Sequence, residues 1–268
     1  MSRRAEIEAV ARERLGFTEL RPGQLEAVEA VLAGRDTLAV MSTGSGKSAI
    51  YQIAGLLTVG PTVVVSPLIA LQEDQIESAE GIAEGEAAAL NFTLSAQERE
   101  AVFAEAEDDE LEFVLLAPEQ LANAENLERL RAAGPSLFVV DEAHCVSQWG
   151  HDFRPDYLRT GPAAEALGRP PILALTATAA PPVRAEIADV LRLRDPAVVI
   201  RGFDRPNIRL AVARYHEAAH KRHALLERVQ AGCSRPWPRV LRHTAGGRGG
   251  SRRARSLGGC APPSTTAG

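Results

Sequence analysis

Two adjacent carboxylates, Asp141 and Glu142, directly follow the apolar run Leu137–Val140. Carboxylates at the end of a buried strand could hold a metal ion and activate water. We expect Asp141 to hold Mg²⁺ and Glu142 to orient and deprotonate an attacking water molecule. Acids at a strand end can also be ordinary solvated residues. The reactive interpretation is favoured because a phosphate-binding sequence lies upstream.

Residues 43 to 48, Thr-Gly-Ser-Gly-Lys-Ser, have the composition of a phosphate-binding loop. Glycines allow backbone N–H groups to surround phosphate oxygens, and the start of a following helix adds positive potential. Lys47 would contact the β- and γ-phosphates of ATP in catalysis, and Ser48 would be a second Mg²⁺ ligand. The full pattern has glycine where this chain has Met41, and the alternative is a Gly/Ser turn with a chance lysine. The expected ATP-binding residues here are Thr43, Gly44, Ser45, Gly46, Lys47 and Ser48.

Aromatic and basic side chains follow the acid pair closely. Trp149 and Phe153 could stack on unpaired bases, at about 1–3 kcal/mol each, and Arg154 could pair with a phosphate. The chain has only seven Phe, two Trp and three Tyr, so two aromatics in a Gly/Asp/Arg-rich stretch favour a DNA-binding site over a place in the core. His144 and His151 could couple the two sites, although either could be a structural histidine.

Composition limits what kind of protein this can be. The chain has 268 residues, 45% of them hydrophobic, enough for one large domain or two smaller ones. Residues 1–232 carry all 35 acidic residues but only 23 of the 30 basic ones, so any DNA contact must come from a local patch. The basic residues are 28 Arg and two Lys, which makes Lys47 conspicuous.

The sequence predicts a cytoplasmic protein. It contains no run of 18 apolar residues that would span a membrane, and its charged start does not have the apolar centre of a signal peptide. The three cysteines, Cys145, Cys233 and Cys260, are odd in number and lack metal-ligand spacing, so no zinc site is expected.

Short apolar runs alternate with helical patterns over most of the chain, which predicts an α/β fold with a parallel sheet flanked by helices on both faces. Ligands of such sheets lie at the carboxyl ends of the strands. The expected strands are Thr37–Met41, Thr62–Val65, Ala87–Leu90, Phe113–Leu116, Leu137–Val140, Ile172–Leu175, Val198–Ile200 and Ile208–Val212. The expected helices are residues 5–15, 22–33, 47–57, Pro67–Glu77, Ser95–Ala106, Pro182–Leu191 and Glu217–Gln230.

From about Leu15 to Ile208, the sequence resembles the RecQ-type DNA helicases of superfamily 2. The DEAH sequence at Asp141, followed by Trp149-Gly-His-Asp-Phe-Arg-Pro155, carries the resemblance most specifically. Other similar segments are Leu15–Gln24, Val63–Leu71 with Asp74 and Gln75, Ala117–Leu121, Leu173–Thr178 and Phe203–Asn207.

The resemblance implies further roles for individual residues. It implies that Gln24 reads the adenine edge with Arg21 packed nearby, and that Ser66 and Pro67 belong to a DNA-contacting motif. Thr176 and Thr178 would link ATP hydrolysis to DNA. It also implies a RecA-like P-loop NTPase lobe that uses ATP and Mg²⁺ and binds single-stranded or junction DNA, in a helicase that unwinds DNA with 3′–5′ polarity in recombination and repair.

The resemblance implies a division of the chain into three parts. Residues 1–200 would form the ATP-binding lobe, 201–232 the connector and the start of an incomplete second lobe, and 233–268 a disordered Arg/Gly/Pro-rich tail. The missing second lobe would supply an arginine finger, so we expect a truncated chain with weak ATPase activity and no unwinding.

The acid-free tail leaves several interpretations open. It could arise from a frameshift in GC-rich DNA, or it could be a real basic tail that binds DNA phosphates. The alternative to a helicase is a non-catalytic ATP- and DNA-binding module, or an inert gene fragment. An RNA helicase is disfavoured by the loop from Trp149 to Arg154.

Overall fold

The computed structural model describes residues 2–67, 87–90, 94–108, 110–147, 152–202, 214–215 and 217–232. The chain divides into two units, residues 1–205 and 206–268, and each is described by itself. The expected boundary after residue 200 stays a prediction, and the expected disordered tail at 233–268 lies outside the described residues.

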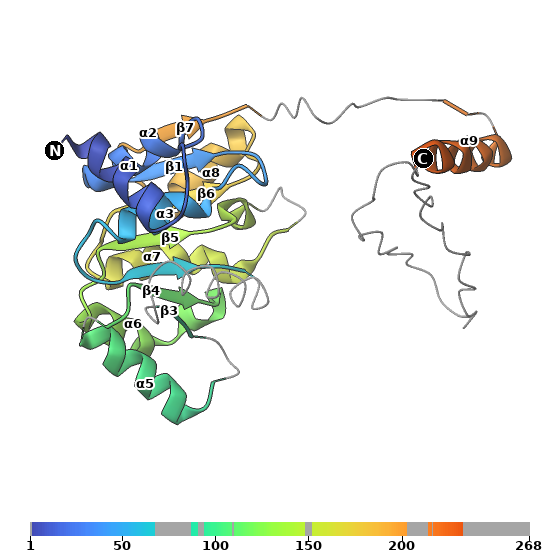
Figure 1. Cartoon of the computed structure of the whole chain (residues 1–268). Helices are drawn as coiled ribbons and strands as arrows, with labels where there is room; N and C mark the ends of the chain where they lie inside the picture. The colour runs from blue at the N-terminus through green and yellow to red at the C-terminus, as the bar shows by residue number, and fades with distance from the viewer. Residues whose placement is uncertain are drawn as a thin grey trace, which may run out of the picture. The chain divides into compact units, whose positions relative to one another are not determined.

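The first unit is built on a sheet whose described strands are all parallel (Figure 1). Their order is β3-β4-β2-β5-β6-β1-β7, so strands far apart in sequence are neighbours in space. The strands are β1 (Thr37–Val40), β2 (Thr62–Val65), β3 (Ala87–Leu90), β4 (Phe113–Leu116), β5 (Leu137–Val140), β6 (Ile172–Thr176) and β7 (Ala197–Ile200).

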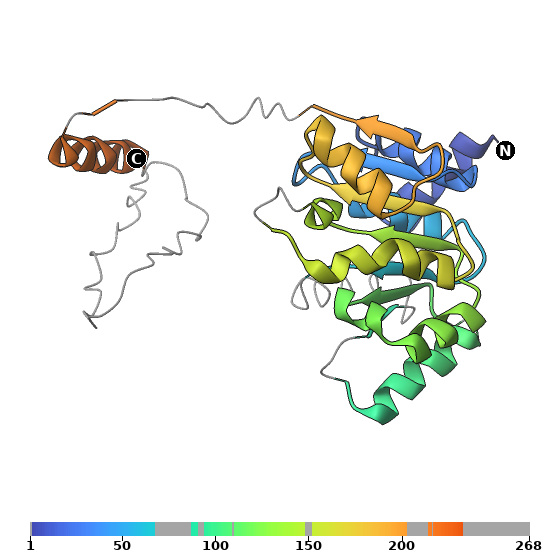
Figure 2. The same ribbon diagram turned by 180° about the vertical axis from the view of Figure 1, so that it is seen from behind.

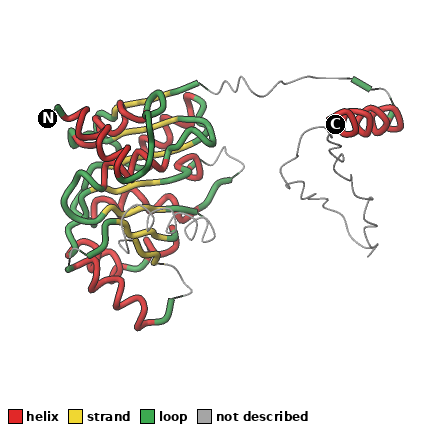
Figure 3. The backbone as a smooth tube through the Cα atoms, viewed as in Figure 1, coloured by secondary structure: helices red, strands yellow, loops and turns green. Residues whose placement is uncertain are grey.

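Helices cover both faces of this sheet, so the expected parallel α/β architecture is confirmed. Figure 1 shows α1 (Arg3–Glu13), α2 (Gln24–Leu32) and α3 (Ser48–Gly55) in front of the sheet. Figure 2 shows the opposite face, and in Figure 3 the yellow strands lie between red helices on both sides. The helices packed against the opposite face are α5 (Ala96–Glu107), α6 (Ala124–Ala132), α7 (Thr160–Ala166) and α8 (Pro181–Val190).

Near-continuous apolar runs form these strands because each one is buried on both faces. In β1, Leu38 and Val40 pack in the core under α5 to α8, whereas Ala39 packs in the core under α1 to α3. Polar side chains instead mark helix starts. Ser95 and Glu98 form a capping box at the start of α5, which satisfies backbone N–H groups that the helix leaves free.

The buried ion pair of Asp36 and Arg169 joins the amino ends of the neighbouring strands β1 and β6. The carboxylate of Asp36, just before β1, accepts hydrogen bonds from the Arg169 guanidinium (2.6 and 3.1 Å) and from the backbone N–H groups of Ile172 (2.9 Å) and Arg194 (2.6 Å). Burial raises the pKa of Asp36, but these hydrogen bonds outweigh it and hold the pKa below its usual value. Three separate segments are thereby joined at one carboxylate.

The predicted strands before residue 201 are confirmed, with ends that differ by at most one residue. The predicted helix Pro67–Glu77, except Pro67, and the whole predicted strand Ile208–Val212 lie outside the described residues. In the second unit, α9 (Ala218–Gly232) agrees with the predicted helix. Among the described residues, no helix is long and apolar enough to cross a membrane.

Candidate ATP site and nucleic-acid interface

The strand order brings three separate segments to one edge of the sheet. β5, β6 and β1 are neighbours, so the loop after β1, the acid pair after β5 and the threonines that end β6 lie together. The carboxyl ends of neighbouring parallel strands form the ligand-binding edge in sheets of this kind. The fold therefore places the predicted phosphate loop beside the predicted acid pair.

The phosphate loop connects β1 to α3, as the sequence predicts. Gly44 and Gly46 adopt positive φ angles of 77° and 79°, which side-chain-bearing residues rarely adopt. Lys47 precedes the first residue of α3, and its Nζ donates a hydrogen bond to the Met41 carbonyl at 3.3 Å. The Ser45 hydroxyl is buried and has no hydrogen-bond partner among the described residues. A phosphate oxygen would provide such a partner.

Gln24 joins this loop to the segment before α2. Its side-chain amide donates to the Gly46 carbonyl at 2.7 Å, and its oxygen accepts from the Arg21 N–H at 2.7 Å. The Arg21 guanidinium hydrogen-bonds the Gly44 carbonyl. A cavity of about 540 Å³ lies between the two segments and is lined by Phe17 among others. The predicted adenine-reading pair is therefore in contact with the phosphate loop.

Asp141 is held in place by its backbone. Its N–H donates to the Val65 carbonyl at 2.9 Å, and its own carbonyl accepts from the hydroxyl of fully buried Tyr157 at 3.1 Å. Its side chain is nearly buried, and Oδ1 accepts a hydrogen bond from the N–H of Glu142. The carboxylate thus has a fixed position at the end of β5.

Glu142 has a strained backbone. Its φ of 48° and ψ of 44° lie in the left-handed region, which costs energy for a non-glycine residue and often marks functional sites. Its carboxylate lies 3.2 Å from Nδ1 of His144. The hydrogen bond and charge of His144, together with the charge of Lys47, lower the pKa of Glu142 against the opposing effect of burial. Glu142 is therefore ionised near neutral pH, as a water-activating base requires.

His144 connects the acid pair to β6. Its Nδ1 also lies 3.1 Å from the Thr176 hydroxyl, which donates to the Thr178 carbonyl at 3.1 Å and accepts from the Thr178 N–H. Its Nε2 lies 3.6 Å from the Asp152 carboxylate. The hydrogen bond to Glu142 and the nearby charge of Asp152 raise the pKa of His144. The predicted coupling residues His144, Thr176 and Thr178 are thus in one network.

The predicted DNA-contacting residues lie partly within the described chain. The Arg154 guanidinium donates to the Pro67 carbonyl at 2.7 Å, which joins the segment after the acid pair to the segment after β2. Ser66, beside Pro67, is buried, whereas Phe153 is half-buried. Trp149 and His151 lie outside the described residues.

The described residues fit a magnesium ion bound together with a nucleotide. Such an ion takes one or two protein ligands, and phosphate oxygens and water complete its shell. Ser48 and Asp141 both lie near buried Tyr51, whose hydroxyl hydrogen-bonds Ser48; burial and the charge of Asp141 raise the pKa of Tyr51. When bound, Mg²⁺ would neutralise charge on the phosphates.

A zinc site, unlike the magnesium site, would be built from protein side chains alone. No three His, Cys, Asp or Glu side chains cluster as a metal site in the described part of the chain. Cys233 and Cys260 are outside that part, so the expected absence of a zinc site stays a prediction.

Sequence reasoning missed three residues of this site: Tyr51, Asp152 and Tyr157. Tyr51 follows Ser48 by three positions and so lies on the same side of α3, a signal that helical spacing could have given. Asp152 lies within the segment from Trp149 to Pro155 that carries the resemblance, but the sequence does not show its contact with His144. Tyr157 carried no sequence signal of its contact with Asp141.

Comparisons with known proteins point in one direction. Residues 21–186 match the family described as DEAD/DEAH box helicase. The chain is 41% identical over 215 residues to the probable ATP-dependent DNA helicase RecS of Bacillus subtilis, covering 80% of this chain and 43% of that protein. It is 41% identical over 196 residues to the ATP-dependent DNA helicase RecQ of Pasteurella multocida, covering 72% and 30%. The chain therefore spans less than half the length of these relatives.

Solved structures show the same fold. The DUF1998 helicase MrfA bound to DNA has a TM-score of 0.61 at 18% identity, covering 75% of this chain and 30% of that one. A hypothetical ATP-dependent RNA helicase from Sulfolobus tokodaii has a TM-score of 0.57 at 20% identity, covering 75% and 57%. The fold is thus that of a RecA-like helicase lobe.

Proposed function

Because the chain belongs to the DEAD/DEAH box helicase family and is similar to RecQ and RecS, we propose that its first unit is the ATP-binding motor lobe of a DNA helicase. The observation that carries the proposal is the strand order β5-β6-β1, which places the phosphate loop with Lys47 and the acid pair with Glu142 at one edge of the sheet. ATP hydrolysis needs both a phosphate-binding cation and a base at one place.

Each residue of the ATP site has a role that its position supports. Lys47 and the loop from Thr43 to Ser48 bind the phosphates, and Ser48 and Asp141 hold Mg²⁺. Glu142 orients and deprotonates the attacking water. Gln24 recognises adenine, and Arg21 holds the segment against the phosphate loop through the Gly44 carbonyl.

DNA binding is assigned to the opposite end of the segment that begins with the acid pair. Trp149 and Phe153 would stack on unpaired bases, and Arg154 would align that loop through its hydrogen bond to Pro67 beside Ser66. His144, His151, Thr176 and Thr178 would transmit the state of the nucleotide to this surface. The resemblance to RecQ supports a helicase that binds single-stranded or junction DNA and unwinds duplex DNA with 3′–5′ polarity in recombination and repair. The cytoplasmic location that the sequence predicts is part of the proposal.

Efficient hydrolysis would also need a second lobe that closes over the nucleotide. An arginine finger from such a lobe is worth about 10³–10⁵ in rate.

The test is DNA-stimulated ATP hydrolysis by the chain and by two lysine variants. Lys47→Ala should abolish hydrolysis, whereas Lys221→Ala on α9, the other lysine of the chain, should leave it unchanged. Hydrolysis that is equal in the Lys47→Ala variant would refute the assigned ATP site. Nucleotide and DNA binding without any hydrolysis would instead identify a non-catalytic binding module.

A further inference from the structure

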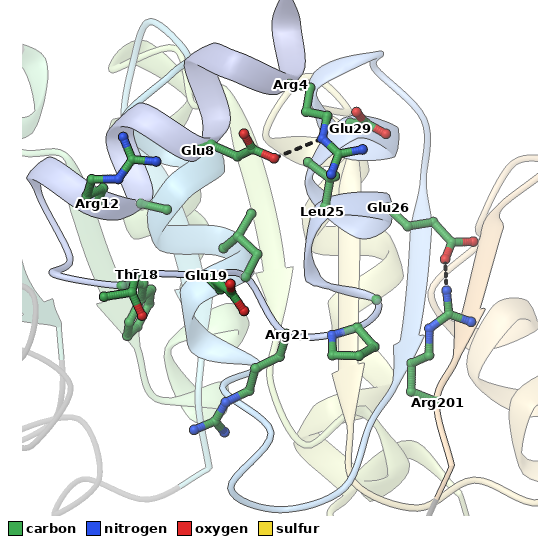
Figure 4. A pocket seen from close by; sticks show the side chains of 15 residues that line it. Arg4, Glu8, Arg12, Thr18, Glu19, Arg21, Leu25, Glu26, Glu29 and Arg201 are labelled. Carbon is green, nitrogen blue, oxygen red and sulfur yellow. Dashed lines mark hydrogen bonds and ion pairs between the residues drawn. The ribbon is translucent and has the colours of Figure 1, made fainter.

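Arg201, the residue after β7, lies over the first turn of α2, although Arg201 and Glu26 are 175 positions apart (Figure 4). Its guanidinium forms a hydrogen-bonded ion pair with the Glu26 carboxylate. Its backbone N–H donates to the Val40 carbonyl at 3.0 Å. Arg201 is therefore anchored at its backbone to β1 and at its side chain to α2.

Gly23 provides the contact surface under Arg201. It is the N-cap of α2, with a φ of 92°, and a Cβ built there would lie 2.7 Å from Cγ of Arg201 and 3.3 Å from Val199. The stem of Arg201 thus occupies the space that a side chain at Gly23 would need. Gly23 lies between Arg21 and Gln24, the two residues that contact the phosphate loop.

Two cavities lie beside the segment from Arg21 to Gln24. One is the cavity of about 540 Å³ beside the phosphate loop, and the other has about 620 Å³ and is lined by Arg201 and Glu26. Phe17, Thr18, Glu19 and Arg21 line both. On one side the segment is held by its bonds to Gly44 and Gly46, and on the other by Arg201.

We propose that Arg201 and Glu26 are positioning residues for adenine selection. By holding the first turn of α2 in place, they keep the Gln24 side-chain amide in the position where it can hydrogen-bond the adenine edge. The proposal rests on the proposed role of Gln24. Both side chains are about half exposed, 45% for Arg201 and 54% for Glu26, and exposed pairs contribute little to folding stability. Their effect should therefore fall on base selection rather than on the fold.

The test is a double-mutant cycle with Arg201→Ala and Glu26→Gln, measuring the affinities for Mg·ATP and Mg·GTP by competition with a fluorescent ATP analogue. Each single variant should lower ATP affinity about two- to fivefold and leave GTP affinity unchanged, and the double variant should be no worse than either single one. Arg201→Lys should restore part of the loss. Thermal unfolding should show that all variants are folded.

A matched control lies in the same cavity. Arg4 and Glu8 form an exposed ion pair there, with Nε of Arg4 2.8 Å from Glu8, so Arg4→Ala should not change the ratio of ATP to GTP affinity. An equal loss for both nucleotides in Arg201→Ala, or additive effects in the cycle, would overturn the proposal. Gln24→Ala separates the two hypotheses. If it lowers the ratio and Arg201→Ala does not, only the positioning role fails; if it leaves the ratio unchanged, adenine reading by Gln24 fails as well.

Discussion

Nδ1 of His144 lies 3.1 Å from the hydroxyl oxygen of Thr176, which joins the segment after β5 to the end of β6. The same nitrogen faces Glu142, the proposed base. A movement of the threonine would therefore change the surroundings of the base, and a change at the base would reach β6. This contact gives the proposed coupling between nucleotide and DNA a physical route.

Replacing Thr176 by valine should weaken the proposed coupling between nucleotide and DNA through His144. The change preserves the shape of a fully buried side chain but removes its hydrogen bonds to His144 and Thr178. One lost hydrogen bond is worth about 0.5–1.5 kcal/mol, so we expect DNA stimulation of ATP hydrolysis to fall roughly two- to tenfold. The control is Thr62→Val on β2, a buried threonine whose hydroxyl has no partner among the described residues. Equal losses in both variants would contradict the role of Thr176.

Replacing Glu142 by glutamine should lower the pKa of His144. The folded-state pKa of His144 is raised mainly by its hydrogen bond to Glu142, and the glutamine removes the negative charge. NMR titration of the His144 ring in both proteins measures the change. An unchanged pKa would mean that Asp152, 3.6 Å from Nε2, holds the proton instead.

The same pair predicts how stability depends on pH. The raised pKa of His144 gives stability that is lost as pH rises through that value, and the lowered pKa of Glu142 gives stability that is lost as pH falls through its value. The contribution of this pair to folding stability is therefore greatest at pH values between the folded-state pKa of Glu142 and that of His144. Thermal unfolding over this pH range should show a larger difference between the parent protein and Glu142→Gln inside that window than outside it.

Phe153 is the described aromatic residue assigned to DNA. Loss of a base-stacking ring costs about 1–3 kcal/mol, so Phe153→Ala should weaken binding of single-stranded DNA by roughly five- to 150-fold. Fluorescence anisotropy with a labelled oligonucleotide measures this. Leu158→Ala, a nearby apolar residue exposed on the η3 turn (Pro155–Arg159), should have no effect. Equal affinity of the parent protein and Phe153→Ala would refute the stacking role of Phe153.

Asp36 should be the carboxylate on which folding depends most. Its removal leaves a largely buried arginine without its carboxylate partner, so Asp36→Ala should destabilise the fold by about 3–5 kcal/mol. Glu8→Gln, which breaks an exposed pair, should change stability by at most about 1 kcal/mol. Because the folded-state pKa of Asp36 is lowered, its contribution is present above the unfolded-state pKa and is lost as pH falls through the folded-state value. Chemical denaturation at neutral and acidic pH tests both statements.

The sequence predicted the parts of the fold that depend on local pattern. Runs such as Val63–Val65 and Val139–Val140 read as buried strands because they are apolar on both faces. The short helices α6 and α7 were not foreseen. The seven-residue α7 contains Gly161 and Pro162, which weaken any helical pattern.

Contacts between distant segments could not be read from the sequence. The strand order that places β1 between β6 and β7 is a tertiary property, and so is the convergence of Arg169, Ile172 and Arg194 on Asp36. The candidate site residues could be proposed from the sequence because their types and spacing indicate chemistry locally. The groups that hold them, such as Tyr157 behind Asp141, became visible only in three dimensions.

The position of β1 within the sheet also determines when the protein can begin to work during synthesis. The phosphate-loop strand emerges from the ribosome early, but its neighbours β6 and β7 are made last in the first unit. The bond from the Arg194 N–H to Asp36 spans 158 positions, and pairing over such lengths is slow because long loops must close first. In the nascent chain, β1 therefore has neither of its neighbouring strands until β6 has left the exit tunnel, and it has only one of them until β7 follows.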